Sequence, residues 1–180
     1  HLFLSEFHCP SGFLAGARSC YNAQAYTSMA GLLYAAIDSA AWLAAVPKAN
    51  LGTRTDFKEW TEKYVDPASS LGCTATELYA ARCGILHAKT PESAMAKKRG
   101  LRRIQYAVKG YKLPNPKSKD DVVISLEGLE KAVARALWLF LLDLWENWEQ
   151  REAAMERLQE MVRVGPWESQ LKELEAQSKP

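Results

Sequence analysis

Apolar residues between Ala15 and Val46 recur at the spacing of an amphipathic helix. The stretch contains no proline, and its apolar positions follow an i, i+3, i+4, i+7 pattern that places them on one helical face. These positions are Met29, Leu32, Leu33, Ala36, Ile37, Ala40 and Leu43. The pattern predicts one long helix that ends before Pro47.

Two shorter helices are predicted to follow. The first runs from about Thr55 to Val65 and ends at Asp66-Pro67. The second begins with Thr74-Ala75-Thr76-Glu77, whose threonine and glutamate have the spacing of a capping box, and it ends before Pro91. Gly84 lies inside this helix, where glycine costs about 1 kcal/mol relative to alanine. Such a glycine indicates a close approach of another helix.

The C-terminal third of the chain predicts the central helix of the fold. Residues 125–163 contain no proline, Ser125 is a plausible N-cap, and residues 136–142 are apolar on all sides of a helix. The later, charged part either continues this helix or follows a kink near Trp148. Gly165-Pro166 ends the helical pattern.

A basic segment separates these helices. Nine basic residues and no acidic residue occur from Ala94 to Lys119. They are Lys97, Lys98, Arg99, Arg102, Arg103, Lys109, Lys112, Lys117 and Lys119. Two β-like runs, residues 103–108 and 121–124, flank a turn-rich stretch that contains Pro114 and Pro116. This order predicts a small β-hairpin or extended arm.

Length and composition indicate a single domain. The chain has 180 residues, 48% hydrophobic and 24% charged, which are typical fractions for a globular protein with one core. We therefore expect an all-α protein, an up-and-down bundle of about four to five helices. Residues 1–180 form one domain in this prediction. It comprises an N-terminal extension (1–14), the basic hairpin or arm (94–124) and a C-terminal tail (164–180).

Several classes of protein do not fit the sequence. The four cysteines are far apart and match no zinc pattern, which predicts reduced thiols in a cytoplasmic protein. Residues 2–7 lack the basic start of a signal peptide, and no apolar run is long enough to span a membrane. No phosphate-binding loop, nucleophile elbow or dinucleotide fingerprint occurs. We expect no cofactor and no metal.

The remaining motif is Arg82-Cys83-Gly84-Ile85-Leu86-His87, which separates an arginine from a histidine by four residues near a helix end. It resembles the R-x4-6-H signature of the HEPN superfamily, helical-bundle domains that include many metal-independent ribonucleases of toxin and defence systems. In that family the residue after the arginine is often asparagine, and here it is Cys83. The resemblance implies a homodimer in which motif residues from two protomers line one cleft.

The chemistry of the motif can be stated from the residues themselves. Cleavage of RNA without a metal needs a base for the ribose 2′-hydroxyl and a cation for the phosphate, roles suited to His87 and Arg82. On an ideal helix these two positions are roughly 140° apart, so the helix must change before His87 if both face one site. We expect RNA to bind along the basic segment. The RNA-binding residues would be Lys97, Lys98, Arg99, Arg102, Arg103 and Lys109.

Other interpretations stay open. Arginine and histidine near a helix end are also typical of a C-cap that interacts with the helix dipole. The basic run also fits a solvated loop or the docking face for an acidic partner. Asp143 must be paired if buried, and Arg135 or Arg82 would be the partner. Trp138, Trp145 and Trp148 fit the core or a dimer interface. The alternative function is a non-catalytic interaction domain that binds a protein partner or a nucleotide.

Overall fold

The structure is a computed structural model that describes residues 7, 12–45, 54–88, 100–110 and 119–160, with only the backbone described at positions 87, 88 and 160. The chain is mostly helical, as predicted. Its helices are α2 (Phe13–Asn22), α3 (Tyr26–Ala44), α4 (Arg54–Trp60), α5 (Pro67–Leu71), α6 (Ala75–Cys83), α8 (Leu126–Glu146) and α9 (Trp148–Glu160). Two π-helical turns, η1 (Thr61–Val65) and η2 (Gly84–Ala88), extend α4 and α6. The strands are β1 (Arg103–Ala107) and β2 (Asp121–Ser125).

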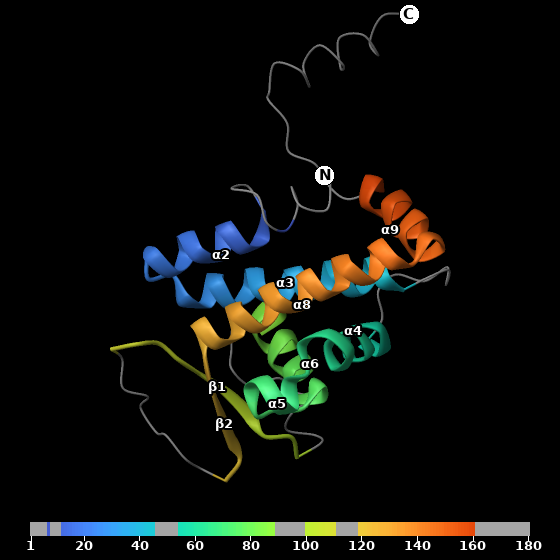
Figure 1. The fold of residues 1–180 in the computed structure, drawn as a ribbon. Coiled ribbons are helices and arrows are strands. Elements are labelled where there is room, and N and C mark those ends of the chain that lie inside the picture. The colour runs from blue at the N-terminus through green and yellow to red at the C-terminus, as the bar shows by residue number, and fades with distance from the viewer. Residues whose placement is uncertain (1–6, 8–11, 46–53, 89–99, 111–118, 161–180) are drawn as a thin grey trace, which may run out of the picture.

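The helices do not form a clean up-and-down bundle. The long helices α3 and α8 run side by side, α2 lies along one side of them, and the short helices α4, α5 and α6 lie across the other (Figure 1). The expectation of a regular bundle was therefore wrong in detail, because the five other described helices are too short to run the length of α3 and α8.

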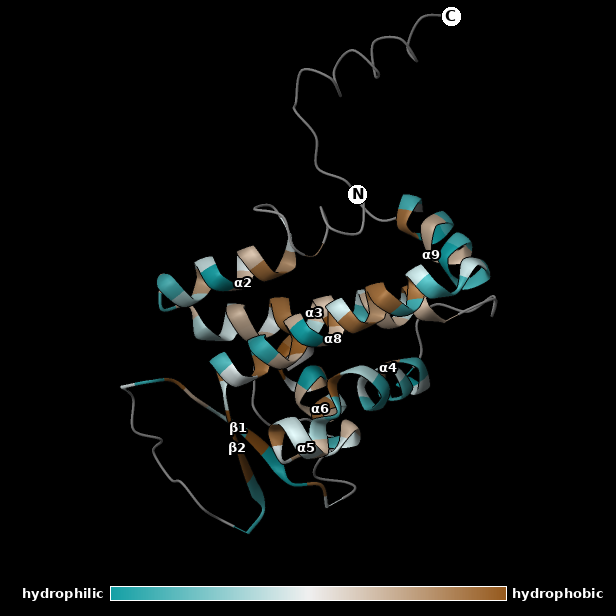
Figure 2. Cartoon of the chain, in the orientation of Figure 1, coloured by the Kyte–Doolittle hydropathy of each residue, from teal (hydrophilic) through white to brown (hydrophobic). Residues whose placement is uncertain are grey.

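The core lies where α3 and α8 meet the surrounding helices. Figure 2 shows hydrophobic residues concentrated between α3 and α8 and hydrophilic residues along α4 and α9. The largest fully buried side chains include Tyr34, Phe57, Phe140, Met29 and Leu33. Trp60, Tyr64 and Phe140 pack as a ring cluster with edge-on and tilted contacts, which joins α4 and η1 to α8.

The predicted long N-terminal helix is instead two helices that fold back on each other. The chain leaves α2 at Ala23, and Gln24 adopts a left-handed φ of 58°. The amides of Gln24 and Ala25 donate to the carbonyls of Tyr21 and Cys20, which closes the turn. The fold-back packs α2 against α3, where a Cβ on Gly16 would lie 3.3 Å from Leu32. No glycine or proline marks this break in the sequence.

The two predicted strands exist, but they are parallel and not a hairpin. Arg103 pairs with Asp121 and Ala107 with Ser125 along the register. Residues 108–120 connect them, about the dozen residues that a parallel crossover requires. The hairpin prediction was wrong because turn-forming residues do not reveal the direction in which the chain returns. Ile104, Val122 and Ile124 are buried beneath the helices.

Two helix starts were predicted correctly, and the structure decides a third boundary that the sequence left open. Thr74 and Glu77 form both hydrogen bonds of the capping box at α6. The Ser125 hydroxyl accepts from the amide of Gly128 and caps α8. Of the two alternatives for the charged part, the structure has the break near Trp148: α8 ends before Asn147, whose side-chain oxygen accepts from the amide of Gln150 and caps α9.

Candidate functional site

Arg82, the predicted phosphate-stabilising cation, is engaged in an ion pair. It lies in the last turn of α6, and its Nε and a terminal nitrogen both lie 2.7 Å from Oδ2 of Asp38 on α3. Its guanidinium also lies over the ring of Tyr79, 5.8 Å from the centroid. The side chain is one-fifth exposed. Arg82 therefore ties α6 to α3 and has its charge balanced within the fold.

The chain between Arg82 and position 87 leaves α-helical geometry. Helix α6 ends at Cys83, and Gly84 opens the π-helical turn η2, which contains position 87. A π turn takes more residues per turn than an α turn, so it reduces the angle between positions 82 and 87 below the value for an ideal α-helix. The side chain of His87 lies outside the described residues.

The turn η2 packs against α3, and Gly84 is buried. A Cβ on Gly31 of α3 would lie 3.8 Å from Leu86 and 3.9 Å from Ile85, which is ordinary van der Waals contact, so the packing of η2 does not require a glycine on α3. The close approach of another backbone at Gly84 itself stays a prediction.

Arg102 forms an ion pair with Glu77 in the first turn of α6. Its Nε donates to Oε1 of Glu77 over 2.7 Å and its terminal nitrogen to Oε2 over 2.9 Å. Burial would raise the pKa of the Glu77 carboxyl, but the hydrogen bonds from Arg102 and Thr74 lower it below its usual value. The capping-box glutamate is therefore also the anchor of the basic segment.

Arg103 fixes the register of the two strands. Two of its nitrogens donate to the two carboxylate oxygens of Asp121 over 2.8 and 3.1 Å, and Gln105 donates to the same carboxylate over 2.6 Å. The Asp121 side chain is 2% exposed. Lys109 is exposed to solvent. Lys97, Lys98 and Arg99 lie outside the described residues, so their predicted role in RNA binding stays a prediction.

Asp143 is paired with Lys63, and not with Arg135 or Arg82 as the sequence suggested. Its Oδ2 lies 2.6 Å from Nζ of Lys63 and accepts from the Tyr64 hydroxyl over 2.8 Å. The hydrogen bond from Lys63 is the main cause of a lowered pKa of the Asp143 carboxyl. Because η1 packs against α8, a partner from η1 was in reach, and the sequence pattern did not reveal this contact.

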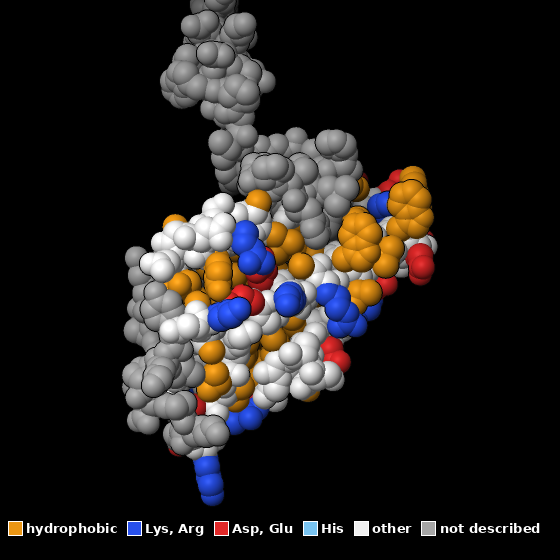
Figure 3. Space-filling model, turned by 60° about the vertical axis from the view of Figure 1, so that its left-hand side comes forward, with side chains coloured by type: hydrophobic (Ala, Val, Ile, Leu, Met, Phe, Trp, Pro, Cys, Tyr) orange, Lys and Arg blue, Asp and Glu red, His pale blue; other side chains and the backbone are white. Residues whose placement is uncertain are grey.

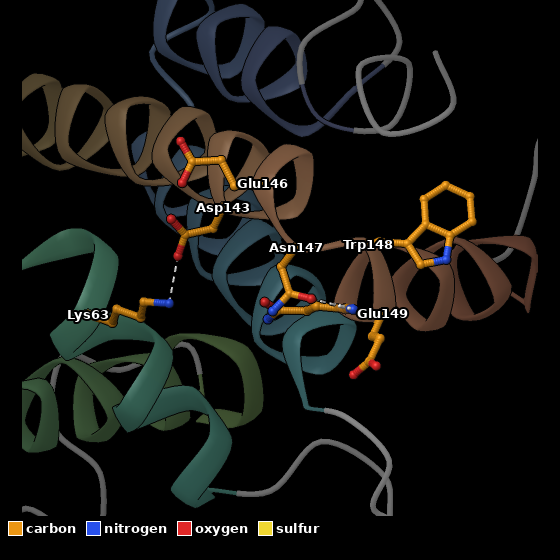
Figure 4. Close-up of a pocket in the computed structure, with 7 residues that line it drawn as sticks. Lys63, Asp143, Glu146, Asn147, Trp148 and Glu149 are labelled. Atoms are coloured by element: carbon orange, nitrogen blue, oxygen red, sulfur yellow. Dashed lines mark hydrogen bonds and ion pairs between the residues drawn. The ribbon is translucent and has the colours of Figure 1, made fainter.

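This ion pair lies in an open groove of about 490 Å³ at the junction of α8 and α9 (Figure 4). Glu146, Trp148 and Glu149 also line it, and the side chains of Glu146 and Trp148 point away from the ion pair. With Lys63 and Asp143 balanced, the two glutamates leave the groove with negative charge. The charge of its lining therefore does not favour a phosphate ligand.

A surface that the sequence assigned to the core or to an interface is exposed. Four large apolar side chains on the second half of α8 and at the start of α9 are exposed: Trp138 (51%), Leu142 (45%), Trp145 (76%) and Trp148 (59%). The prediction that the three tryptophans belong to the core was wrong, while the interface alternative stays open. Figure 3 shows exposed hydrophobic side chains gathered at one end of the view, with acidic side chains beside them. We call Trp138, Leu142, Trp145 and Trp148 the aromatic face.

Arg151 supports one end of the aromatic face. Its guanidinium lies over the rings of Trp148 and Trp145, 4.5 and 6.0 Å from their centroids. A terminal nitrogen also approaches the Trp145 carbonyl at 3.5 Å, where α8 ends. The two rings are thereby held at the surface in defined positions. The helical spacing of the tryptophans was visible in the sequence, but the side of α8 on which they lie was not.

No metal site is visible among the described residues, where no three potential ligands from histidine, cysteine, aspartate and glutamate come together. Cys20, Cys73 and Cys83 are free thiols, and burial, followed by the charge of Glu77, raises the pKa of Cys73 to about 12. None of the described helices combines the length and apolarity needed to cross a bilayer.

Comparisons with known proteins give no match to this chain among family models, curated proteins or solved structures.

Proposed function

We propose that the chain is a non-catalytic helical interaction domain that binds a protein partner through the aromatic face. The observation that supports this proposal most strongly is the exposure of Leu142 and Trp145 on α8, whose opposite side is packed in the core, and of Trp148 at the start of α9. Large exposed apolar patches on globular proteins are typical of interaction sites, and tryptophan and arginine are enriched among the residues that dominate binding energy.

The charges of the described residues also favour binding of a protein over binding of RNA. Arg82, Arg102 and Arg103 are each held by a carboxylate of the same chain. Binding to RNA depends on cations that neutralise phosphates, and a cation already paired with a carboxylate contributes less to it. The groove beside the aromatic face is acidic and would repel a phosphate backbone.

Site-specific photo-cross-linking tests this proposal. A photoreactive aromatic residue in place of Trp145 is expected to give discrete adducts in a cell extract. The same residue in place of Val123, an apolar side chain that is 42% exposed on β2, is the matched control. Identical adducts at both positions, or none at position 145, would contradict the proposal.

A second candidate function, a metal-independent endoribonuclease, is favoured by the π-helical turn at Gly84. This turn brings positions 82 and 87 closer to one side of the helix, and π turns occur frequently at functional sites. In this reading His87 moves the proton and Arg82 stabilises the phosphate charge. The substitution His87→Ala is expected to lower the cleavage rate by a factor of about 10² to 10⁴. A chelator is expected to leave the rate of the wild-type protein unchanged.

The ion pair with Asp38 supplies a control for this second candidate. Arg82→Ala leaves the Asp38 carboxylate without its main partner and so disturbs the fold as well as the site. The double variant Asp38→Asn with Arg82→Ala removes that carboxylate charge. If cleavage stays low in the double variant, Arg82 acts on the substrate; if it recovers, Arg82 is structural. Intact RNA after hours with micromolar wild-type protein rejects the nuclease.

A further inference from the structure

We infer that the partner of the aromatic face is a second copy of this chain, bound with the two α8 helices antiparallel and centred on position 140. This inference rests on the proposed function and names the partner for that same surface. Three features of α8 support it: the spacing of its exposed residues, the order of its charges, and the match between this order and that of an antiparallel second copy.

The exposed residues of α8 form one narrow stripe. At about 100° per residue they fall within an arc of roughly 100°, and their steps of four and three residues are those of a seam between paired helices. The stripe consists of Lys131, Arg135, Trp138, Leu142, Trp145 and Glu146. The buried residues of α8, among them Leu137 and Phe140, lie on the opposite side. The stripe is therefore a second helix-packing surface, facing away from the core.

Charges are separated along this stripe. Lys131 and Arg135 lie in its N-terminal half, the apolar residues follow, and Glu146 lies at its C-terminal end. These three charged side chains form no ion pair with any other residue that the structure describes. One end of the stripe is thus cationic and the other anionic.

When two copies of α8 are antiparallel and related by a two-fold axis at position 140, the basic end of each stripe faces the acidic end of the other. This arrangement places Glu146 of the second copy opposite position 134, between Lys131 and Arg135, where opposite charges attract. It places Arg135 opposite Trp145 of the second copy, in reach of a cation–π contact. Trp138 and Leu142 meet at the centre. A parallel arrangement would instead place Lys131 against Lys131, so the sequence of charges selects the antiparallel one.

The same charges argue against a membrane or a nucleic acid as the occupant. Nucleic acids and membranes that contain acidic lipids are anionic, and the acidic groups Glu146 and Glu149 lie beside Trp145 and Trp148 at the most exposed end of the aromatic face. A second copy presents an acidic group to the basic end of the stripe and basic groups to its acidic end. Closed two-fold pairing of this kind is the commonest form of protein self-association.

Charge exchange between two variants tests this arrangement. Lys131→Glu places an acid beside Glu146 of the second copy, and Glu146→Lys places a base beside Lys131 of the second copy. Each variant alone is expected to associate about tenfold more weakly than wild type in sedimentation velocity at low salt, because the changed contact occurs twice per dimer. A 1:1 mixture of the two variants restores opposite charges at both contacts and is expected to associate as tightly as wild type.

Two more variants of the full chain complete the experiment. Trp145→Glu is expected to abolish association, and Glu62→Lys, which changes an exposed acid on η1, to leave it unchanged. Circular dichroism verifies that each variant is folded. A monomeric wild-type protein up to about 100 μM overturns the inference, as do a dimer that survives Trp145→Glu and a mixture that stays monomeric. Cross-linking at position 145 then distinguishes the two failures: adducts with other proteins leave the proposed function standing, and their absence rejects it as well.

Discussion

The segment around β1 and the exposed stripe of α8 both carry basic residues, but they use them in opposite ways. Arg102 and Arg103 reach carboxylates that are almost fully buried, Glu77 and Asp121, and each forms a two-pronged ion pair. Lys131 and Arg135 extend from α8 into solvent, and neither forms an ion pair with another residue that the structure describes. A run of positive charge is therefore poor evidence for an external ligand until its internal partners are known.

The largest expected effect on stability concerns the ion pair between Arg102 and Glu77. Glu77→Ala removes two hydrogen bonds from Arg102 and those from Thr74, and we expect it to lower the free energy of unfolding by about 3 kcal/mol. Glu146→Ala, at an exposed position on α8, is the control and should change it by less than about 0.5 kcal/mol. Urea denaturation of the three proteins measures the difference. Equal stabilities would mean that the Arg102 pair contributes nothing.

The next largest effect is expected from acid, which protonates the ion-paired carboxylates and so lowers the free energy of unfolding. The folded-state pKa values of Glu77 and Asp143 are lowered, so both carboxyls stabilise the fold fully above their unfolded-state values of about 4. This contribution is lost as the pH falls from about 4 through the lowered folded-state values. Thermal melts at a series of pH values should show a steeper loss of stability below pH about 4 for wild type than for Glu77→Gln.

How much of this was predictable differs between local and distant contacts. The capping box at Thr74, the N-cap at Ser125 and the two strands follow from short-range pattern, and the structure contains them. The turn at Gln24 escaped prediction because an unremarkable residue adopts the left-handed conformation there. The direction of β2 also depends on packing across the molecule.

For the candidate site, residue types were predictable and their partners were not. The sequence identified Arg82, Arg102 and Arg103, but their carboxylates lie 44, 25 and 18 positions away in the chain. Hydrophobic periodicity identified the tryptophans of α8 as members of a helix, yet a helix that is apolar on all sides does not reveal which side faces the core. That side is set by the contacts of α8 with α3 and η1.

The smallest expected effect on stability concerns the stripe itself. Leu142→Ser replaces a side chain that is 45% exposed, so it leaves no cavity in the core, and the free energy of unfolding at submicromolar concentration should change by less than about 0.5 kcal/mol. Phe140→Ala, two residues away on the buried side, should cost about 3 to 5 kcal/mol. At high concentration wild type should gain stability from self-association while Leu142→Ser does not, because binding to the folded state adds to its stability by mass action. Melts at two concentrations about a hundredfold apart measure this gain. A large loss for Leu142→Ser in dilute solution would show that this side of α8 is part of the core, and the contrast between the two regions would then disappear.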